Sequence, residues 1–409
     1  MQATGVTSAV SSEVPAVASL EINLENLFEF PEGRRILGCT QCGMCTGSCP
    51  YGDVMEYPPR RLIAMLLAGQ IEKVVRSDAL LGCVACYHCM AKCPRGIRLT
   101  EVLLPLIKEQ VFLNLPEAPA ELHRALENTL RYGNPFGESS RKRAAWAKTA
   151  GVPVRILSYD PRPADVLWIV ECQNSYHPRG QDVSRATARL FHALGIDFAI
   201  LGNEEKCAGE CARLLGERGL FDTLMDYNMV VFSRYRFNRI VTSGVHAYDA
   251  FVYEYPERGF RYPVEQTTPF LARYVERLRP MLTRRLPYVV TYHDSCCLGR
   301  HNGYYEEPRA LLRAIPGIRL VEMVHNRVNA ICCGGGGGGM WLDTYFKAKG
   351  YERLSERRVK EAVASGADVL AISCPYELSR FEDALKVLGY DNRMVVRDVV
   401  ELLAESLAG

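Results

Sequence analysis

Two cysteine segments in one repeated frame constrain this chain more than any other feature. "CTQCGMCTGSCP" occupies residues 39–50 and "CVACYHCMAKCP" occupies residues 83–94, so each cysteine recurs 44 positions later in the order C-x-x-C-x-x-C-x-x-x-C-P. Structural zinc usually takes two C-x-x-C pairs separated by a loop, and a redox C-x-x-C needs a single pair. Two identical four-cysteine frames instead indicate the ferredoxin segments that hold 4Fe–4S clusters.

The spacing also predicts which cysteines share a cluster. In ferredoxin segments the fourth cysteine binds the cluster of the other segment. The predicted ligands are therefore Cys39, Cys42, Cys45 and Cys93 for one 4Fe–4S cluster, and Cys49, Cys83, Cys86 and Cys89 for the second. Apolar residues recur at helical spacing in residues 58–77 and 100–115, which predicts that helices carry both segments.

Length and composition narrow the class of protein. A chain of 409 residues predicts two or three domains, and a net charge of +2 gives no indication of a nucleic-acid surface. Sixteen clustered cysteines in a long α/β-like chain indicate a reducing compartment rather than a disulfide scaffold. Residues 1–30 lack a signal-peptide pattern and are expected to be a flexible leader. No apolar stretch is long enough to span a bilayer, so we expect a cytoplasmic protein without a transmembrane segment.

The composition changes after a predicted helical domain at residues 31–132. Residues 133–165 are rich in Gly, Pro, Ser and basic residues and predict a surface linker. Within them, "RKRAAWAK" at residues 141–148 is expected to be a solvated face, with a docking surface as the alternative. Short apolar runs then alternate with helical patterns, which predicts parallel α/β layers. The predicted strands are residues 165–172, 197–202, 239–244, 288–296, 318–323 and 368–374, and the predicted helices are residues 184–195, 268–282 and 351–366.

This α/β pattern occurs twice. Each half opens with a strand that ends at a cysteine, Cys172 or Cys296, and has a second cysteine site at Cys207 or Cys332. We predict two pseudo-equivalent lobes, residues 166–284 and 285–409, with sites at the C-terminal ends of their strands. The glycine run at residues 334–339 lacks the Lys-Ser/Thr of a phosphate loop. We expect that it holds the backbone close to a bulky cluster, where side chains would not fit.

These segments resemble the cysteine-rich "CCG" family, which includes the B and D subunits of heterodisulfide reductase. The matching residues are "ECQNSYHPRGQDVSRATARLF" at 171–191, "HDSCCLGRHNGYYEEPR" at 293–309 and "CCGGGGGGMW" at 332–341. The ferredoxin half resembles the C subunit, so the chain looks like the fused C and B arrangement of the D subunit. In that family a complete five-cysteine motif can hold a noncubane pair of fused 4Fe–4S clusters that reduces a disulfide. Other members relay electrons beside a flavoprotein.

In the second lobe the resemblance implies the terminal redox site. Its last family cysteine is replaced by Glu377, a harder ligand that suits iron–sulfur chemistry less well. The implied ligands of a 4Fe–4S cluster are Cys296, Cys332, Cys333 and Cys374, and the candidate catalytic residues among them are Cys332 and Cys333. A noncubane centre that adds Cys297 or Glu377 is an alternative, and so is a surface position for Glu377.

The first lobe departs further from the family pattern. Gly244 and Ala247 stand at its C-x-x-C positions, and its C-C-G is reduced to Cys207-Ala-Gly. Two interpretations stay open, a structural lobe without a ligand and a 4Fe–4S cluster. The candidate ligands of that cluster are Cys172, Cys207, Cys211 and His246. For His246, a hydrogen-bonded core histidine is the alternative to a ligand.

Taken together, these patterns predict an α+α/β chain: an N-terminal helical di-cluster ferredoxin domain followed by two pseudo-repeated α/β CCG lobes. The expected function is iron–sulfur electron transfer in a multi-subunit flavoprotein redox complex of the heterodisulfide reductase type. The expected partners are a flavoprotein subunit and other redox subunits, because no G-x-G-x-x-G fingerprint follows a strand. The alternatives are an iron–sulfur subunit of a flavin-linked hydroxyacid or succinate-type dehydrogenase, and a zinc-stabilised scaffold.

Overall fold

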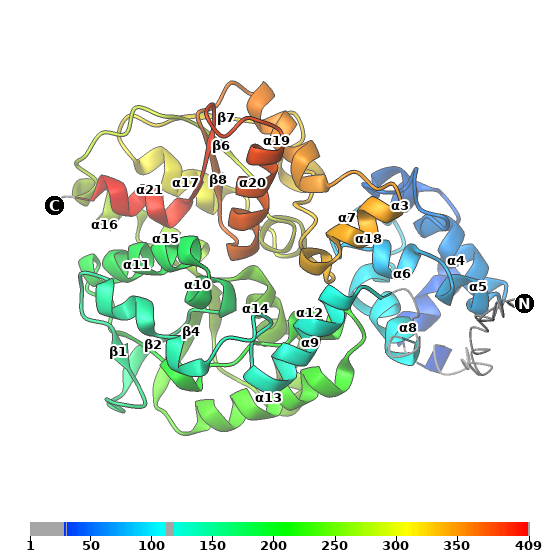
Figure 1. The fold of residues 1–409 in the computed structure, drawn as a ribbon, viewed down its shortest axis with the longest axis horizontal. Coiled ribbons are helices and arrows are strands. Elements are labelled where there is room, and N and C mark those ends of the chain that lie inside the picture. Colours follow the sequence, from blue (N-terminus) through cyan, green and yellow to red (C-terminus); the bar gives the residue numbers. More distant parts are fainter. Residues whose placement is uncertain (1–27, 30, 112–117, 408–409) are drawn as a thin grey trace, which may run out of the picture.

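The computed structural model describes residues 28–29, 31–111 and 118–407. The expected leader, apart from residues 28 and 29, and the end of the helix predicted at residues 100–115 lie outside the described residues. Figure 1 shows a helical N-terminal part at one end of the molecule and two lobes stacked one above the other beside it. The three predicted parts are therefore distinct in space, and the predicted α+α/β class is confirmed.

Short helices form the N-terminal part, and those within residues 31–111 share a core of their own. The short helices are α2 (Pro31–Arg34), η1 (Arg35–Gly38), α3 (Met44–Ser48), α4 (Pro59–Leu67), α5 (Ile71–Val75), α6 (Ala79–Gly82), α7 (His88–Ala91), η2 (Leu99–Leu103), α8 (Leu104–Val111) and α9 (Ala120–Tyr132). The helical pattern predicted over residues 58–77 is divided into α4 and α5. Gly69 lies between them with a φ of +72°, a conformation that ends a helix and that glycine adopts without strain.

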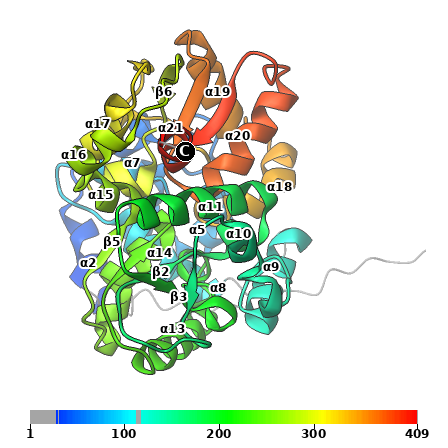
Figure 2. The same cartoon turned by 90° about the vertical axis from the view of Figure 1, so that its left-hand side faces the viewer.

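The first lobe is built on a parallel five-stranded sheet. Its strands are β1 (Arg155–Ile156), β2 (Ala164–Ile169), β3 (Phe198–Ile200), β4 (Phe237–Thr242) and β5 (Val264–Gln266), in the order β1-β3-β2-β4-β5. Its helical segments are α10 (Cys172–Tyr176), α11 (Pro178–Ala193), η6 (Gly202–Glu204), α12 (Glu210–Leu214), α13 (Arg218–Ser233), α14 (Val245–Asp249), η7 (Ala250–Glu254), η8 (Tyr255–Arg258), α15 (Thr267–Ala272), α16 (Val275–Leu278) and η9 (Arg279–Met281). Figure 2 shows α10 and α11 on the face of this sheet toward the second lobe and α13 on the opposite face.

The second lobe repeats the same topology with four strands. They are β6 (Val289–Tyr292), β7 (Arg319–Val321), β8 (Val369–Ile372) and β9 (Val395–Asp398), all parallel, in the order β7-β6-β8-β9. The helical segments are η10 (Cys296–His301), α17 (Glu306–Ala314), η11 (Arg327–Asn329), η12 (Gly339–Trp341), α18 (Asp343–Ala348), α19 (Leu354–Ala364), α20 (Pro375–Val387) and α21 (Val399–Ser406). In each half the next two strands lie on either side of one central strand, β2 or β6, so each half has a switch point beside that strand, where open α/β sheets bind ligands.

The two lobes meet at the C-terminal ends of their central strands. The Gln266 side chain donates hydrogen bonds to the backbone oxygens of Ser243, after β4, and Ser373, after β8. On the outer side α11 packs against α21, and Arg179 forms ion pairs with Glu401 and Glu382. The sites predicted at the strand ends therefore lie between the lobes, away from the outer helices.

The segment predicted as a surface linker packs against the first lobe. Within residues 133–165, η4 (Ser140–Lys142), η5 (Ala145–Thr149) and β1 are ordered elements, and β1 pairs with β3. The Trp146 ring lies edge-on to Trp168, with centroids 5.4 Å apart, and Arg143 is buried. The expectation of a solvated face is therefore wrong at Arg143 and Trp146, because a long-range partner buries each of them.

Among the residues that the structure describes, no helix has the length and apolar character needed to cross a membrane.

A buried charge network joins the three parts. The His301 ring of the second lobe stacks on Tyr87 of the N-terminal part, with centroids 4.2 Å apart and planes 1° from parallel. Its Nε2 lies 3.4 Å from Oε1 of Glu101, in the N-terminal part, and its Nδ1 lies 3.3 Å from Oδ2 of Asp249, in the first lobe. Burial disfavours the charged imidazole, but the two carboxylates outweigh it and raise the pKa of His301 to about 10.

We expect His301→Gln to lower the free energy of unfolding at pH 7 by about 2–4 kcal/mol, because it leaves two buried carboxylates without their shared cation. The raised pKa means that this stabilisation is complete below about pH 6.5 and is lost as the pH rises through 10. The difference in free energy of unfolding between variant and wild type, measured by urea unfolding, should therefore become smaller above pH 9. His325→Gln is the matched control, because the His325 side chain is 56% exposed beside Glu361. Equal effects of the two variants would contradict the prediction.

Candidate iron–sulfur centres

The two N-terminal cysteine segments fold into the same loop. Gln41 and Ala85, which occupy equivalent positions, have φ values of 55° and 48°. Gly43 and Tyr87, also equivalent, have φ values of 82° and 59°. Left-handed backbone costs a residue with a side chain about 1 kcal/mol or more, and such strain persists where the surroundings impose it. The shared conformation points the cysteines of both segments inward in the same way.

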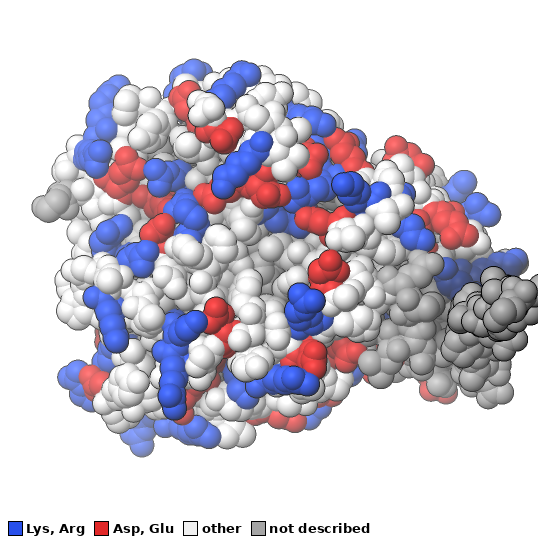
Figure 3. Space-filling model, in the orientation of Figure 1, with Lys and Arg blue, Asp and Glu red and all other residues white. Residues whose placement is uncertain are grey.

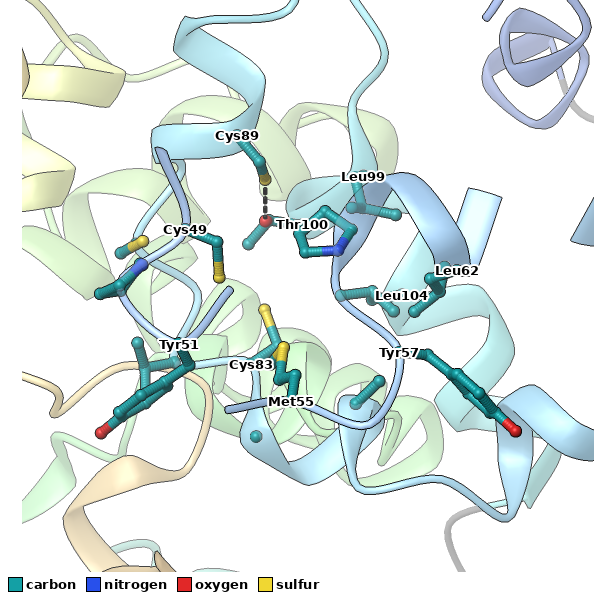
Figure 4. Close-up of a pocket in the computed structure, with 16 residues that line it drawn as sticks. Cys49, Tyr51, Met55, Tyr57, Leu62, Cys83, Cys89, Leu99, Thr100 and Leu104 are labelled. Carbon is teal, nitrogen blue, oxygen red and sulfur yellow. Dashed lines mark hydrogen bonds between the residues drawn. The ribbon is translucent and has the colours of Figure 1, made fainter. Parts of the chain in front are cut away.

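One cavity of about 460 Å³ collects four thiols of the N-terminal part. Figure 4 shows the sulfur atoms of Cys49, Cys83 and Cys89 directed into it, and Cys86 also lines it. Most of the remaining lining is apolar and includes Tyr51. Burial raises the pKa of the Cys49 thiol well above its ordinary range.

A second cavity, of about 410 Å³, lies beside the first. It is lined by Cys39, Cys42, Cys45 and Cys93. The Cys89 residue borders both cavities, and Cys42 is exposed to solvent. Apart from the shared Cys89, each cavity is thus lined by the cysteines that the spacing groups together, three from one segment and the fourth from the other.

The chemistry of both cavities fits an iron–sulfur cluster. All sixteen cysteines are free thiols, and thiolates are the soft ligands that these clusters prefer. A thiol whose pKa is raised by burial is deprotonated when it coordinates a metal. Four converging sulfur atoms in an apolar cavity therefore provide a complete ligand set for one cluster.

A buried cation lies beside the first of these cavities. Lys108 is 2% exposed, and its ammonium donates a hydrogen bond to the backbone oxygen of Leu214 at 3.2 Å. It follows Leu104, which lines the cavity, by one turn on the same face of α8. Burial lowers the pKa of Lys108, against a smaller opposing effect of the Cys83 thiolate. No carboxylate pairs with Lys108 in the described part of the chain, so thiolates are its nearest source of negative charge. No pattern in the sequence distinguishes this lysine from the others.

The second-lobe cysteines converge from three strand ends. Cys296 and Cys297 begin η10 after β6, Cys332 and Cys333 precede the glycine run, and Cys374 caps α20 after β8. All five are buried, and the sulfur atoms of Cys296 and Cys332 lie 3.9 Å apart. The structure therefore brings together every cysteine expected for this site.

Glu377 and an unpredicted histidine complete the second-lobe site. Ligand atoms of His293, Cys333 and Glu377 lie within 4.8 Å of one another. Glu377 is 1% exposed, which excludes the alternative of a surface residue. The buried Arg358 donates from Nε to Nδ1 of His293 at 3.0 Å, so the other ring nitrogen faces Glu377 and Cys333. His293 lies one residue after β6. Its position at the end of a strand is the sequence feature that could have identified it as a site residue.

The glycine run makes a different close approach from the one expected. A Cβ added at Gly336 would lie 2.7 Å from the backbone oxygen of Val84, and one at Gly337 would lie 2.5 Å from that of Cys83. Side chains at these positions would push the second lobe away from the ferredoxin segment. Arg300 adds a hydrogen bond of 2.7 Å to the backbone oxygen of Cys86. The run therefore joins the second-lobe site to the cavity lined by Cys83 and Cys86.

Two of the first-lobe cysteines form a pair beside a buried arginine. Arg143 donates to the sulfur of Cys172 at 3.5 Å and pairs with Glu205 at 2.6 Å. A hydrogen bond with the Cys207 thiol, together with Arg143, lowers the pKa of Cys172 to about 7. Cys211 lines one cavity together with Cys207, and its sulfur lies 3.7 Å from the hydroxyl of Tyr376 in the second lobe.

His246 faces the second lobe instead of the first-lobe cysteines. Its Nδ1 lies 3.8 Å from the sulfur of Cys297, and its ring lies 5.3 Å from that of Tyr376. Within the described residues, no hydrogen bond joins His246 to Cys172, Cys207 or Cys211. His246 follows β4 and Tyr376 follows β8. Each of these aromatic residues thus lies against a cysteine of the other lobe.

A carboxylate fills the position of the missing first-lobe cysteine. Any Cβ added at Gly244 would collide with the side chain of Glu171, which accepts hydrogen bonds from the Gly244 backbone and the Thr242 hydroxyl. Burial raises the pKa of Glu171 to about 8. Glu171 has a φ of 72°, and sequence reasoning missed it because it precedes the motif cysteine.

Family profiles match the three parts of the chain. A cysteine-rich domain (CCG) profile matches residues 166–246 and again residues 290–376. A 4Fe–4S dicluster domain profile matches residues 38–98.

Several curated proteins are similar over most of the chain. The D subunit of dihydromethanophenazine:CoB–CoM heterodisulfide reductase from Methanosarcina barkeri is 30% identical, over 95% of this chain and 81% of its own length. The probable iron-sulfur-binding oxidoreductase FadF of Bacillus subtilis is 34% identical over 98% of this chain. EtfAB:quinone oxidoreductase of Syntrophomonas wolfei is 32% identical over 71% of this chain. The chain spans 51% and 41% of the length of the last two relatives.

We expect Lys108→Met to lower the reduction potential of a cluster in the Cys49, Cys83, Cys86 and Cys89 cavity by on the order of tens of millivolts. A buried positive charge stabilises the reduced, more negative state of a nearby cluster. Redox titration followed by electron paramagnetic resonance measures the shift. Lys73→Met, at an exposed position on α5, is the control and should change nothing. An unchanged potential in Lys108→Met would show that this lysine has only a packing role.

Proposed function

The chain belongs to the family of CCG-domain iron–sulfur oxidoreductases that includes the D subunit of heterodisulfide reductase, and from this premise we propose that it is an electron-transfer subunit. It takes single electrons from a flavoprotein partner at its N-terminal part and delivers them to a terminal centre in the second lobe. The complex is of the heterodisulfide reductase type and acts in the cytoplasm.

Contact between the glycine run and the second ferredoxin segment carries this proposal. Gly336 and Gly337 allow the second-lobe backbone to touch the backbone of Cys83 and Val84. Electron transfer requires that successive centres lie close together through packed protein. Here glycine residues allow two thiol-lined sites to approach each other closely. This close approach supports an electron relay better than it supports a scaffold of independent sites.

The proposed ligand sets follow the two cavities and the second-lobe site. They are Cys39, Cys42, Cys45 and Cys93 for the first cluster, Cys49, Cys83, Cys86 and Cys89 for the second, and Cys296, Cys332, Cys333 and Cys374 for the third. Such clusters, when bound, supply one-electron chemistry over a wide range of potentials. In the third site the chain adds His293 and Glu377, which can hold a proton beside Cys333. The burial of these side chains excludes bulk water from that position.

The difference in burial supports the N-terminal part as the place where a protein partner docks. Cys42, which lines the cavity of Cys39, Cys45 and Cys93, is exposed, whereas Cys86 and Cys89 of the other N-terminal cavity are buried and Cys297 of the second lobe is 0% exposed. A protein partner can therefore reach the Cys42 cavity directly.

We expect Cys93→Ser to damage the cluster whose other ligands are Cys39, Cys42 and Cys45, because the fourth cysteine serves the neighbouring segment. Cys49→Ser is the matched variant and should damage the cluster held by Cys83, Cys86 and Cys89. Electron paramagnetic resonance of the dithionite-reduced protein distinguishes the two signals. If each variant alters the cluster of its own segment, the crossed assignment of the fourth cysteine is wrong. If anaerobic reconstitution yields bound zinc and no labile sulfide, the iron–sulfur interpretation itself is wrong.

Cys333→Ala tests the function as a whole. We expect the variant to contain about four fewer irons and to take up about one electron fewer in a reductive titration, with the two N-terminal signals intact. Turnover with an electron acceptor should be lost. Cys207→Ala, in the first lobe, is the matched control and should retain turnover. If Cys333→Ala turns over normally and Cys207→Ala is inactive, the terminal site belongs to the first lobe.

A further inference from the structure

An exposed rim surrounds the cavity of Cys39, Cys42, Cys45 and Cys93. Two apolar side chains stand out from it, Leu37, which is 66% exposed, and Met44, which is 50% exposed. Met44 follows Cys42 by two residues, and Leu37 precedes Cys39 by two. The rim of the cavity with the exposed Cys42 thiol thus carries two apolar side chains.

Three guanidinium groups belong to the same rim. Arg60 and Arg95 line the cavity, and both are exposed. Arg95 donates from Nε to the backbone oxygen of Gly38 at 3.0 Å, which holds it over the first segment. Arg35 is also exposed, and its Nη1 would lie 3.7 Å from a Cβ added at Gly96, two residues after Pro94. We call Arg35, Leu37, Met44, Arg60 and Arg95 the arginine-rich face.

The charge of the arginine-rich face is unbalanced. In the part of the chain that the structure describes, no carboxylate forms an ion pair with Arg35, Arg60 or Arg95, and none lines the cavity. Elsewhere surface arginines commonly have partners, as Arg76 has in Glu72. Figure 3 shows Lys and Arg interspersed with Asp and Glu over the visible face of the two lobes. A local excess of positive charge around the one exposed cluster-site thiol is therefore a feature of this face, in a chain whose net charge is only +2.

We propose that the arginine-rich face is the docking surface for an acidic one-electron carrier protein whose redox group lies near its own surface. This proposal rests on the proposed function and specifies its partner. The three arginines steer a negatively charged partner and orient it, because complementary charge acts mainly on the rate of encounter. Leu37 and Met44 supply the small apolar contact that excludes water next to Cys42.

The transfer itself is a single-electron step. The carrier would lose one electron and a cluster held by Cys39, Cys42, Cys45 and Cys93 would accept it, so that no covalent bond is made or broken. A membrane surface fits this face less well, since two apolar side chains bury too little area to hold a protein on a bilayer. A small contact area suits a carrier that must leave after each transfer, as in other weak redox encounters.

Stopped-flow reduction of the full chain by an acidic flavodoxin in its hydroquinone state tests the proposal. For the wild type, we expect the second-order rate constant to fall steeply with ionic strength. The triple variant Arg35→Glu, Arg60→Glu, Arg95→Glu should lower that constant at low salt by about tenfold or more. Arg35→Gln, Arg60→Gln, Arg95→Gln should give an intermediate effect. Three exposed cations of the lobes serve as the matched control, Lys148→Glu, Arg189→Glu and Arg319→Glu, and their combined variant should keep the wild-type rate.

A second reductant separates this proposal from the proposed function. Photoreduced deazariboflavin is small and uncharged, so it should reduce wild type and all variants at equal rates. Docking on the arginine-rich face is overturned if flavodoxin reduces the charge-reversed variant as fast as wild type, or fails to reduce wild type while deazariboflavin succeeds. It is also overturned if the arginines govern binding to vesicles containing phosphatidylglycerol and leave the flavodoxin rate unchanged. Failure of deazariboflavin to reduce the wild-type N-terminal clusters would instead contradict the proposed function.

Discussion

The backbone contact between Gly336–Gly337 and Cys83–Val84 determines how the rest of this molecule is arranged. Two peptide segments can approach this closely only where side chains are absent, so the contact fixes the second lobe against the N-terminal part. The neighbouring interactions reinforce that position. Arg300 bonds to the backbone of Cys86, and the ring of His301 stacks on Tyr87. Each of them uses a residue in or next to a cysteine motif, so assembly of the parts and construction of the sites are the same event.

The two lobes show how a repeated fold can separate its roles. Both keep the same strand order and both bring cysteines to the same strand ends. In the first lobe Glu171 occupies the space at Gly244, whereas Cys374 stands at the equivalent position of the second. The lobes remain connected through His246 and Tyr376, each of which contacts a cysteine of the other lobe. The first lobe therefore lacks cysteines that the second lobe has at equivalent positions, yet it keeps the packing that joins the pair.

Sequence reasoning succeeded where the signal is local and failed where a partner is distant in the chain. The cysteine spacing is a local signal, and the two cavities contain the thiols that it groups together. The strands were predictable because buried parallel strands are short apolar runs between turns. Arg143 and Trp146 were mistaken for a solvated face, since only the tertiary structure reveals Glu205 and Trp168 as their partners. The contact of His246 with Cys297 of the second lobe is likewise revealed only by the tertiary structure.

Burying several thiolates in one interior requires compensating positive charge, and the chain supplies it at each step. A buried anion without a partner costs several kcal/mol, which hydrogen bonds and nearby cations offset. Exposed arginines border the Cys42 cavity, Lys108 lies beside the Cys83 cavity, and Arg380 bonds to the backbone oxygen of Cys333 in the second lobe. Solvent screens the first set and hardly screens the others, because screening falls with burial. At the surface, cationic residues therefore act on the encounter with a partner. In the interior, they act on the energy of the redox centre itself. For this reason the position of each cation matters more than the small net charge of the chain.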